Sequence, residues 1–310
     1  MRTSNRRFFA WAVPVLAAVA IVGFLIGHAH TGAASPQKTR TLSTSRFLLD
    51  YPASWRGGAA APEIPRLPIL HASVLAPDGD ASQAGLLAGE LPAGEPSPLP
   101  SAFVAGLSRL PDTAVVDLLE VQAYRYAQLV VPGFNHALTL YAIPNPTGNE
   151  TLLGCYAATA SSSELKACDQ IVATVTLAGR AQSYDLTPEP AYARELSSSI
   201  AGLNAQRLDL RHAMSSRTSP AVLAALANRL AARFADTAAG LSTLEPSLIA
   251  RRAQAGLSKA ISSARQAYVA LAVAAHRPAR AQLARKQVYE AEANVNAALA
   301  GFSLLGYDQT

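Results

Sequence analysis

The chain has 310 residues, half of them hydrophobic, and its 26 Lys and Arg exceed its 21 Asp and Glu by a net charge of +5. Residues 46–183 carry seven basic and twelve acidic residues, whereas residues 184–310 carry fourteen basic and nine acidic ones. The arginines of the C-terminal part are spread along expected helices and form no cluster, so we expect no nucleic-acid partner. The change of sign near residue 183 indicates a boundary between two domains.

An apolar segment near the N-terminus, residues 8–27, reads FFAWAVPVLAAVAIVGFLIG and contains no charged residue. Such a segment is long enough to cross a bilayer core of roughly 30 Å. Arg2, Arg6 and Arg7 precede it, and this excess of positive charge favours a cytoplasmic N-terminus. We therefore expect residues 1–27 to be a single-pass signal anchor in the cell membrane, with the rest of the chain extracytoplasmic.

A cleaved signal peptide is the alternative interpretation of this segment, because small residues flank both His28 and Gly32, where a signal peptidase can cut. The apolar core of a signal peptide spans about 7–15 residues. The segment here is longer, which favours a retained anchor. Residues 28–44 are small and polar without apolar periodicity, so a flexible linker is expected there.

Short strands separated by turn residues are expected within residues 45–183. The apolar runs that predict them are residues 46–51, 68–75, 84–91, 113–121, 124–131, 136–143 and 150–157. Asp78 and Gly79, between the second and third runs, are typical of a hairpin turn. Ser101 is a suitable N-cap for a short helix that ends before Pro111. Connections of this length favour an antiparallel sheet.

The two cysteines of the chain are Cys155 and Cys168. A single pair outside the cytoplasm most simply forms one structural disulfide. Residues 161–163 are serines that can begin a helix over residues 164–173, and the disulfide would hold that helix against the preceding strand. A redox role is not indicated, because the pair lacks the C-x-x-C spacing.

The middle domain has a family resemblance that rests on two segments and on the order of the elements. The segments are RFLLDYPASW at residues 46–55 and LLGCYAATASSSELKACDQIVATVTL at residues 152–177. With a helix between the early hairpin and the later strands, they resemble the PsbP-like α/β/α sandwich domains of bacterial envelope proteins. The resemblance implies a non-catalytic binding or scaffolding domain and supplies no catalytic residue.

From residue 184 onward Ala, Leu, Arg and Gln dominate, which is a helical composition. Helices are expected at residues 189–214, 219–241, 246–276 and 278–302. Ser219 as N-cap and Pro220 at the first helical position begin the second of them. Because the connections are short, we expect residues 184–310 to form an antiparallel four-helix bundle.

Apolar residues recur in these helices at alternating steps of four and three, the spacing of a coiled-coil-like seam. In the last helix the seam positions are Ala284, Val288, Ala291, Val295, Ala298, Phe302 and Leu305. Arg207 falls on the seam of the first helix. An arginine there must pair with an acid, extend to the surface or reach a partner.

Catalytic, cofactor-binding and metal-binding motifs are absent from the sequence, and none of the six histidines lies in an HExxH motif or near a cysteine. The expected fold class is α+β, with a transmembrane helix, an antiparallel-sheet sandwich domain and an all-α bundle. We expect a non-enzymatic protein, attached to the membrane by its N-terminal helix, that binds a ligand or acts as a scaffold. The bundle is the expected surface for self-association or for a partner protein.

The alternative function is that of an envelope hydrolase whose active site is built from dispersed residues. A concave pocket with converging ionisable groups would favour the hydrolase. Such a pocket is to be sought within residues 45–183 or at their junction with the helices.

Overall fold

The computed structural model describes residues 38–58, 60–146, 148–179, 182–215 and 219–307. Met1–Arg40 and Thr41–Thr310 are separate units, and the second is compact. The strands are β1 (Thr39–Ser43), β2 (Phe47–Pro52), β3 (Trp55–Gly57), β4 (Leu70–Pro77), β5 (Ala84–Leu91), β6 (Thr113–Asp117), β7 (Gln122–Leu129), β8 (Ala137–Ile143), β9 (Glu150–Ala157) and β10 (Thr176–Leu177). The helices are α2 (Ser101–Val104), α3 (Ser163–Val172), α4 (Pro190–Ser215), α5 (Pro220–Ser242), α6 (Arg251–Ala274) and α7 (Pro278–Ser303).

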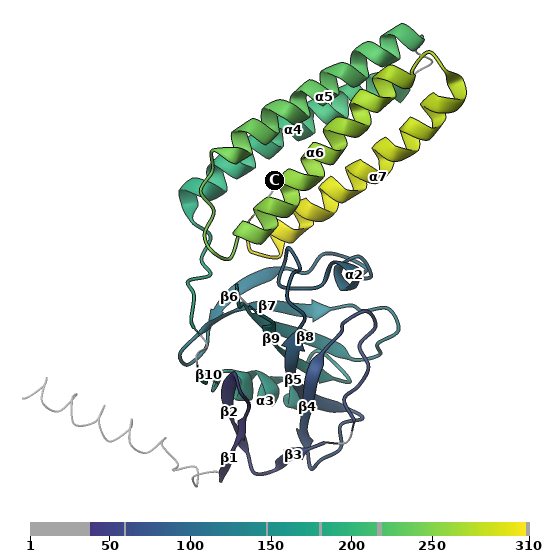
Figure 1. Ribbon diagram of the computed structural model, residues 1–310. Helices are drawn as coiled ribbons and strands as arrows, with labels where there is room; N and C mark the ends of the chain where they lie inside the picture. Colours follow the sequence, from purple (N-terminus) through teal and green to yellow (C-terminus); the bar gives the residue numbers. More distant parts are fainter. Residues whose placement is uncertain (1–37, 59, 147, 180–181, 216–218, 308–310) are drawn as a thin grey trace, which may run out of the picture. The chain divides into compact units, whose positions relative to one another are not determined.

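The described chain has an α+β fold with an antiparallel sheet and a helical part (Figure 1). This corrects the expected fold class, which included a transmembrane helix. Within the described ranges, no helix combines the length and the apolar composition that a membrane crossing requires. The long helices keep most of their charged residues on exposed faces, and Arg207 and Glu292 are buried exceptions. The segment on which the anchor was based, residues 8–27, lies outside the described residues.

The main sheet has seven antiparallel strands in the order β3-β4-β5-β9-β8-β7-β6. Strand β9 lies between β5 and β8 and pairs with β5 along its whole length, from Ala157 opposite Ala84 to Glu150 opposite Leu91. Every residue of β9 is buried. A strand that is buried on both faces requires a cover on each side of the sheet.

The two faces of the sheet contribute to two different hydrophobic clusters. Along β8, Leu138 and Leu140 belong to the first cluster, whereas Tyr141 and Ile143 belong to the second. This division follows from the pleat of a strand, which points successive side chains to opposite faces. The second cluster also contains residues of α3 and β2, and β2 lies between β1 and β10 in a small three-stranded sheet. These elements cover one face.

The predicted disulfide joins Cys155 of β9 to Cys168 of α3, with the Cα atoms 5.7 Å apart. Both cysteines are fully buried. Ser162 caps α3 by accepting a hydrogen bond from the backbone N–H of Leu165. The disulfide therefore attaches α3 to the central strand of the sheet.

The first cluster extends from the other face of the sheet into the helices. It contains Tyr124 and Tyr126 of β7 together with Phe302 of α7 and Leu304 just beyond it. The hydroxyl of Tyr126 is buried and donates a hydrogen bond of 2.7 Å to the carbonyl oxygen of Leu304. The strands and the helices thus share one core cluster, and the division into domains at 45–183 and 184–310 stays a prediction.

Helix α2 is shorter than the sequence predicts, because it ends at Val104 and turns follow it. Ser101 does not act as its N-cap. Pro100 occupies that position, and the Ser101 hydroxyl instead donates a hydrogen bond of 2.8 Å to Oε2 of Glu95. The side chain that was expected to begin the helix therefore fixes the preceding loop.

The long helices pack in chain order, α4 with α5, α5 with α6 and α6 with α7 (Figure 1). Ser219 caps α5 and Pro220 stands in its first turn, as the sequence predicts. Every predicted seam position from Ala284 to Leu305 is buried or half-buried. The seam of α7 therefore faces the protein interior.

Replacing Ala291 with Leu is expected to lower the free energy of unfolding by about 1–3 kcal/mol, because added methyl groups overpack a filled seam. Ala291 is only 7 % exposed. Ala297 lies on the same helix and is exposed, so Ala297→Leu is the matched control and should have little effect. Urea denaturation measures the free energy of unfolding of both variants. Equal effects would show that the assigned register of α7 is wrong.

Replacing Cys155 and Cys168 together with Ser is expected to lower the free energy of unfolding by roughly 3 kcal/mol, because the bridge restricts the unfolded chain. The two residues are separated by 13 positions. Chemical denaturation of the double variant, compared with the oxidised protein, measures this loss. Reduced wild-type protein is the control, since it lacks the bridge but keeps both sulfur atoms. An unchanged denaturation midpoint in both would contradict a stabilising role.

Candidate functional site

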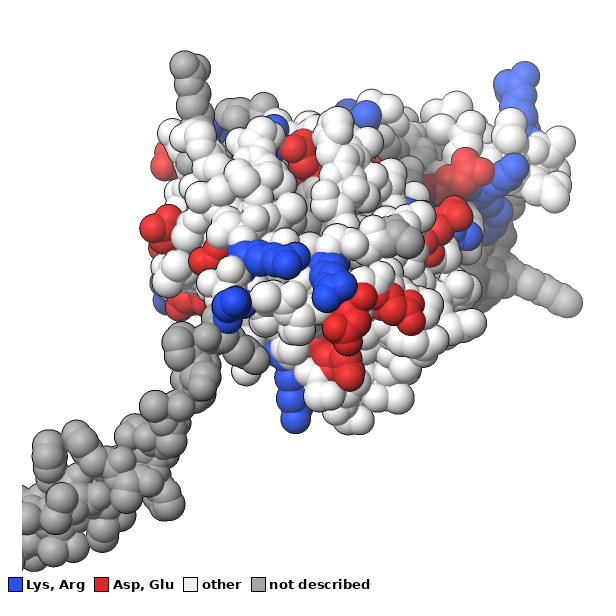
Figure 2. Space-filling model, turned by 90° about the horizontal axis from the view of Figure 1, so that it is seen from below, with Lys and Arg blue, Asp and Glu red and all other residues white. Residues whose placement is uncertain are grey.

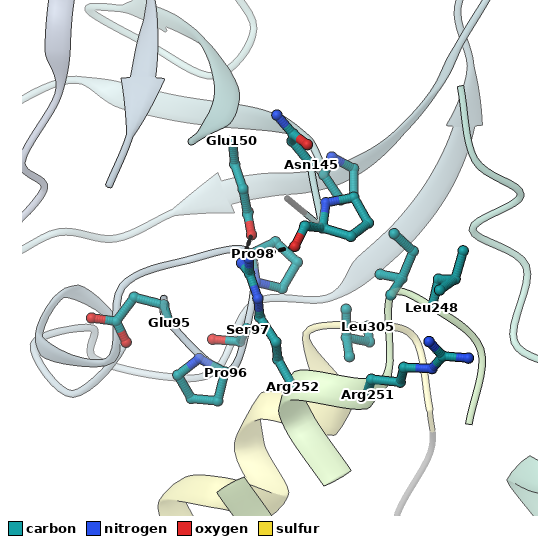
Figure 3. Close-up of a pocket in the computed structure, with 13 residues that line it drawn as sticks. Glu95, Pro96, Ser97, Pro98, Asn145, Glu150, Leu248, Arg251, Arg252 and Leu305 are labelled. Atoms are coloured by element: carbon teal, nitrogen blue, oxygen red, sulfur yellow. Dashed lines mark hydrogen bonds and ion pairs between the residues drawn. The ribbon is translucent and has the colours of Figure 1, made fainter. Parts of the chain in front are cut away.

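A pocket of about 270 Å³ lies where the end of the sheet meets the beginning of α6 (Figure 3). We call it the junction pocket. Residues 95–98, 144–146 and 150 line it from the strand side, and residues 248, 249, 251, 252 and 305 line it from the helix side. It is therefore built from segments that are far apart in the sequence.

Glu150 reaches the junction pocket because of its position in β9. It is the first residue of the strand. Its side chain is on the same face of the sheet as those of Leu152 and Tyr156, which belong to the first cluster. The residue is 8 % exposed. Its Oε1 atom lies 3.9 Å from Nη1 of Arg252, and Figure 3 shows the two side chains pointing toward each other.

Arg252 connects the two sides of the pocket. It is the second residue of α6, and its Nη2 atom donates a hydrogen bond of 2.7 Å to the carbonyl oxygen of Pro146 in the turn between β8 and β9. About a third of its side chain is exposed. Because its nearest atom is 3.9 Å from the carboxyl group and its side chain is partly exposed, Arg252 offsets the charge of Glu150 only in part.

The carboxyl group of Glu150 has unusual acid–base properties. Burial raises its pKa to about 7. The positive charge of Arg252 lowers the pKa and the negative charge of Glu95 raises it, but both effects are smaller than that of burial. Its Oε2 atom is buried and has no hydrogen-bond partner in the described part of the chain. Glu150 therefore exchanges a proton near neutral pH, and its Oε2 atom is an unpaired buried acceptor within the described residues.

Glu95 and Ser97, two further polar residues of the pocket, are already engaged. Oε2 of Glu95 accepts hydrogen bonds from the backbone N–H and the hydroxyl of Ser101, and its carboxylate points away from Glu150 in Figure 3. The Ser97 hydroxyl donates a hydrogen bond of 2.7 Å to the carbonyl oxygen of Leu99. The remaining walls are mostly proline, leucine and isoleucine side chains, together with Asn145 and the exposed Arg251. The pocket thus has apolar walls, and Glu150 is its one acid with an unpartnered buried oxygen among the described residues.

Sequence reasoning missed both Glu150 and Arg252. The available signal for Glu150 was an acid at the head of the apolar run 151–157, where its charge is costly to bury. No signal identified Arg252, whose backbone acceptor lies 106 residues away. The site residues named from the sequence, Cys155 and Cys168, are brought together as a disulfide and lie outside this pocket.

The described chain offers neither a metal-binding group nor a broad charged patch on the face seen in Figure 2. Within the described residues, no three or more His, Cys, Asp and Glu side chains group together so as to hold a metal ion. Figure 2 shows basic and acidic side chains in small groups on a mostly uncharged face. The described side chains on that face form no broad basic surface of the kind that binds phosphate backbones.

No known protein family matches the chain. No curated protein matches it either. A crystal structure of a protein from Bacteroides thetaiotaomicron VPI-5482 at 1.50 Å resolution aligns over 74 % of this chain and 75 % of its own length, with 8 % identity and a TM-score of 0.28. A TM-score this low carries no argument about fold or function. The PsbP-like resemblance therefore stays a prediction.

The free energy of unfolding is expected to fall as the pH rises from about 4.5 to about 7, by roughly 3 kcal/mol from Glu150 alone. Over this range the unfolded chain has released the proton of Glu150, whereas burial keeps the folded chain protonated. Below the range Glu150 is neutral in both states, and above it the full cost of burying the charge remains. Urea denaturation at several pH values measures the decline.

In the Glu150→Gln variant the side chain at position 150 cannot ionise, so its free energy of unfolding should not show this part of the decrease with pH. Glu63→Gln is the matched control, because Glu63 is exposed in the same part of the chain. The free energy of unfolding of the control should decrease with rising pH as that of the wild type does. A Glu150→Gln variant with the wild-type pH dependence would contradict the assigned titration.

Proposed function

We propose that this chain is a non-enzymatic binding protein of an extracytoplasmic, oxidising compartment, and that the junction pocket holds a small, mostly apolar molecule with an N–H donor. One observation carries this proposal: Glu150 is buried in an apolar pocket with its Oε2 atom unpartnered within the described residues. An unpaired buried acceptor costs free energy. A ligand that donates a hydrogen bond to it recovers that cost on binding.

The walls of the pocket support a preformed site for a small ligand. Pro96, Pro98, Pro144 and Pro146 line it, and proline side chains lose little conformational freedom when a ligand binds. The volume of about 270 Å³ lies just below the range of roughly 300–1,000 Å³ that holds drug-sized molecules. An amine is the favoured donor, because its positive charge pairs with the ionised form of Glu150.

The Cys155–Cys168 disulfide supports the location, because disulfides persist in oxidising compartments outside the cytoplasm. The PsbP-like resemblance of residues 45–183 is part of the same proposal, since such domains are non-catalytic binding or scaffolding domains. A partner protein on the helices is compatible with it.

A hydrolase is the second candidate, and a specific observation favours it. The junction pocket is concave, ionisable groups converge there, and a carboxyl group with a pKa of about 7 suits general acid–base catalysis. The second carboxyl group, Glu95, points away and is bonded to Ser101, and the Ser97 hydroxyl is bonded to a carbonyl oxygen. The pocket thus presents one acid without a second catalytic group, which is why we rank binding first.

Cyclohexylamine is expected to bind the wild-type protein with one molecule per chain, as measured by isothermal titration calorimetry. Glu150→Gln should weaken this binding by about tenfold or more, since it removes a charge-assisted hydrogen bond. The affinity should also rise from about pH 6 to about pH 8, because Glu150 ionises in this range while the amine stays protonated.

Glu63→Gln is again the matched control, and cyclohexanecarboxylate is the ligand control because its carboxylate has no N–H group to donate to Glu150. Equal affinity of the wild type and Glu150→Gln for cyclohexylamine would contradict the proposal. Hydrolysis of 4-nitrophenyl acetate or of a 4-nitrophenyl glycoside by the wild type, but not by Glu150→Gln, would establish the hydrolase in its place.

A further inference from the structure

A second pocket, of about 210 Å³, lies among α4, α6 and α7, away from the junction pocket. We call it the arginine pocket. It is lined by Arg211 and Met214 of α4, Tyr268 and Leu271 of α6, and Arg285, Val288, Tyr289 and Glu292 of α7. Its lining combines two guanidinium groups, two tyrosine rings and an apolar base.

The single acid of the arginine pocket is already paired. Oε1 of Glu292 accepts a hydrogen bond of 2.7 Å from the hydroxyl of Tyr268. Oε2 of Glu292 accepts two hydrogen bonds from Arg207, through Nε and Nη2. Asn204 and Asn296 accept further hydrogen bonds from the Arg207 guanidinium. Glu292 and Arg207 therefore neutralise each other, and neither is available to a ligand.

The two arginines at the mouth of the pocket are not neutralised in this way. Arg211 has about half of its side chain exposed and reaches Glu292 only at 3.9 Å. No acid of the described chain lies within ion-pair distance of Arg285. The nearby Glu290 is itself paired with Lys286, at 3.8 Å. The lining thus has an excess of positive charge.

The remaining surface of the pocket fits a flat apolar group. Met214 and Leu271 form a buried base, and Val288 is half-buried beside them. Tyr289 is 72 % exposed, although a tyrosine ring is a large apolar surface. Arginine and tyrosine side chains both stack on planar groups. A ligand ring can therefore contact Tyr289 while its charged group pairs with an arginine.

We propose that the arginine pocket binds a small aromatic carboxylate, with the carboxylate held by Arg211 and Arg285 and the ring packed against Tyr289 and the apolar base. The site is independent of the junction pocket, which favours a ligand of the opposite charge. The two proposals therefore fail or succeed separately.

The probe for this site is 4-fluorobenzoate, whose fluorine resonance reports weak binding to the full chain by NMR. Saturable binding is expected, and Arg285→Gln should weaken it by about tenfold or more through loss of a charge-assisted hydrogen bond. Arg280→Gln is the matched control, because Arg280 is exposed on the same helix and does not line the pocket. Both arginines are exposed, so the variants should fold as the wild type does.

The neutral analogue 4-fluorobenzamide should bind about tenfold more weakly than the acid, and inorganic phosphate should not displace the acid at equal concentration. Equal binding of the amide, equal loss in Arg280→Gln, or displacement by phosphate would each overturn the proposal. Failure of 4-fluorobenzoate to bind at any soluble concentration would overturn it as well.

Discussion

Strand β9 is buried on both faces, and most of the fold follows from that constraint. Its alternating side chains supply two core clusters, and each needs its own cover. On one face the disulfide and the neighbouring small sheet hold α3 in place. On the other face the cover includes Ile64, Leu99 and Phe103 as well as the residues after α7, where Tyr126 donates its hydrogen bond to Leu304.

The same constraint explains why the polar groups of interest are buried. Glu150 begins the buried strand on the side that the helices cover, so its carboxyl group is desolvated by elements that pack for apolar reasons. Arg207 and Glu292 are a comparable case inside the helical part. They span the gap between α4 and α7, and each satisfies the charge of the other. In both places the packing of apolar surface determines the electrostatics.

The two pockets differ in what they leave unsatisfied. In the junction pocket an acid keeps an unpaired acceptor, Oε2 of Glu150, while Arg252 approaches only the other oxygen and donates its hydrogen bond to the carbonyl oxygen of Pro146. In the arginine pocket the acid is fully bonded, and the guanidinium groups around it remain in excess. Opposite charge preferences in one chain are consistent with two small ligands. The two pockets also lie at different parts of the helices. The junction pocket is at the beginning of α6, and the arginine pocket is along its second half.

Features that depend on local spacing could be predicted from the amino-acid sequence. The seam of α7, the Ser219 cap and the strand at residues 150–157 were all readable, because apolar period, short apolar runs and capping are properties of neighbouring residues. The Cys155–Cys168 bridge was readable because the chain offers one pair. Which acid pairs with which arginine could not be predicted in this way. Glu150 and Arg252, and likewise Arg207 and Glu292, are far apart in sequence, and their meeting depends on how whole elements pack.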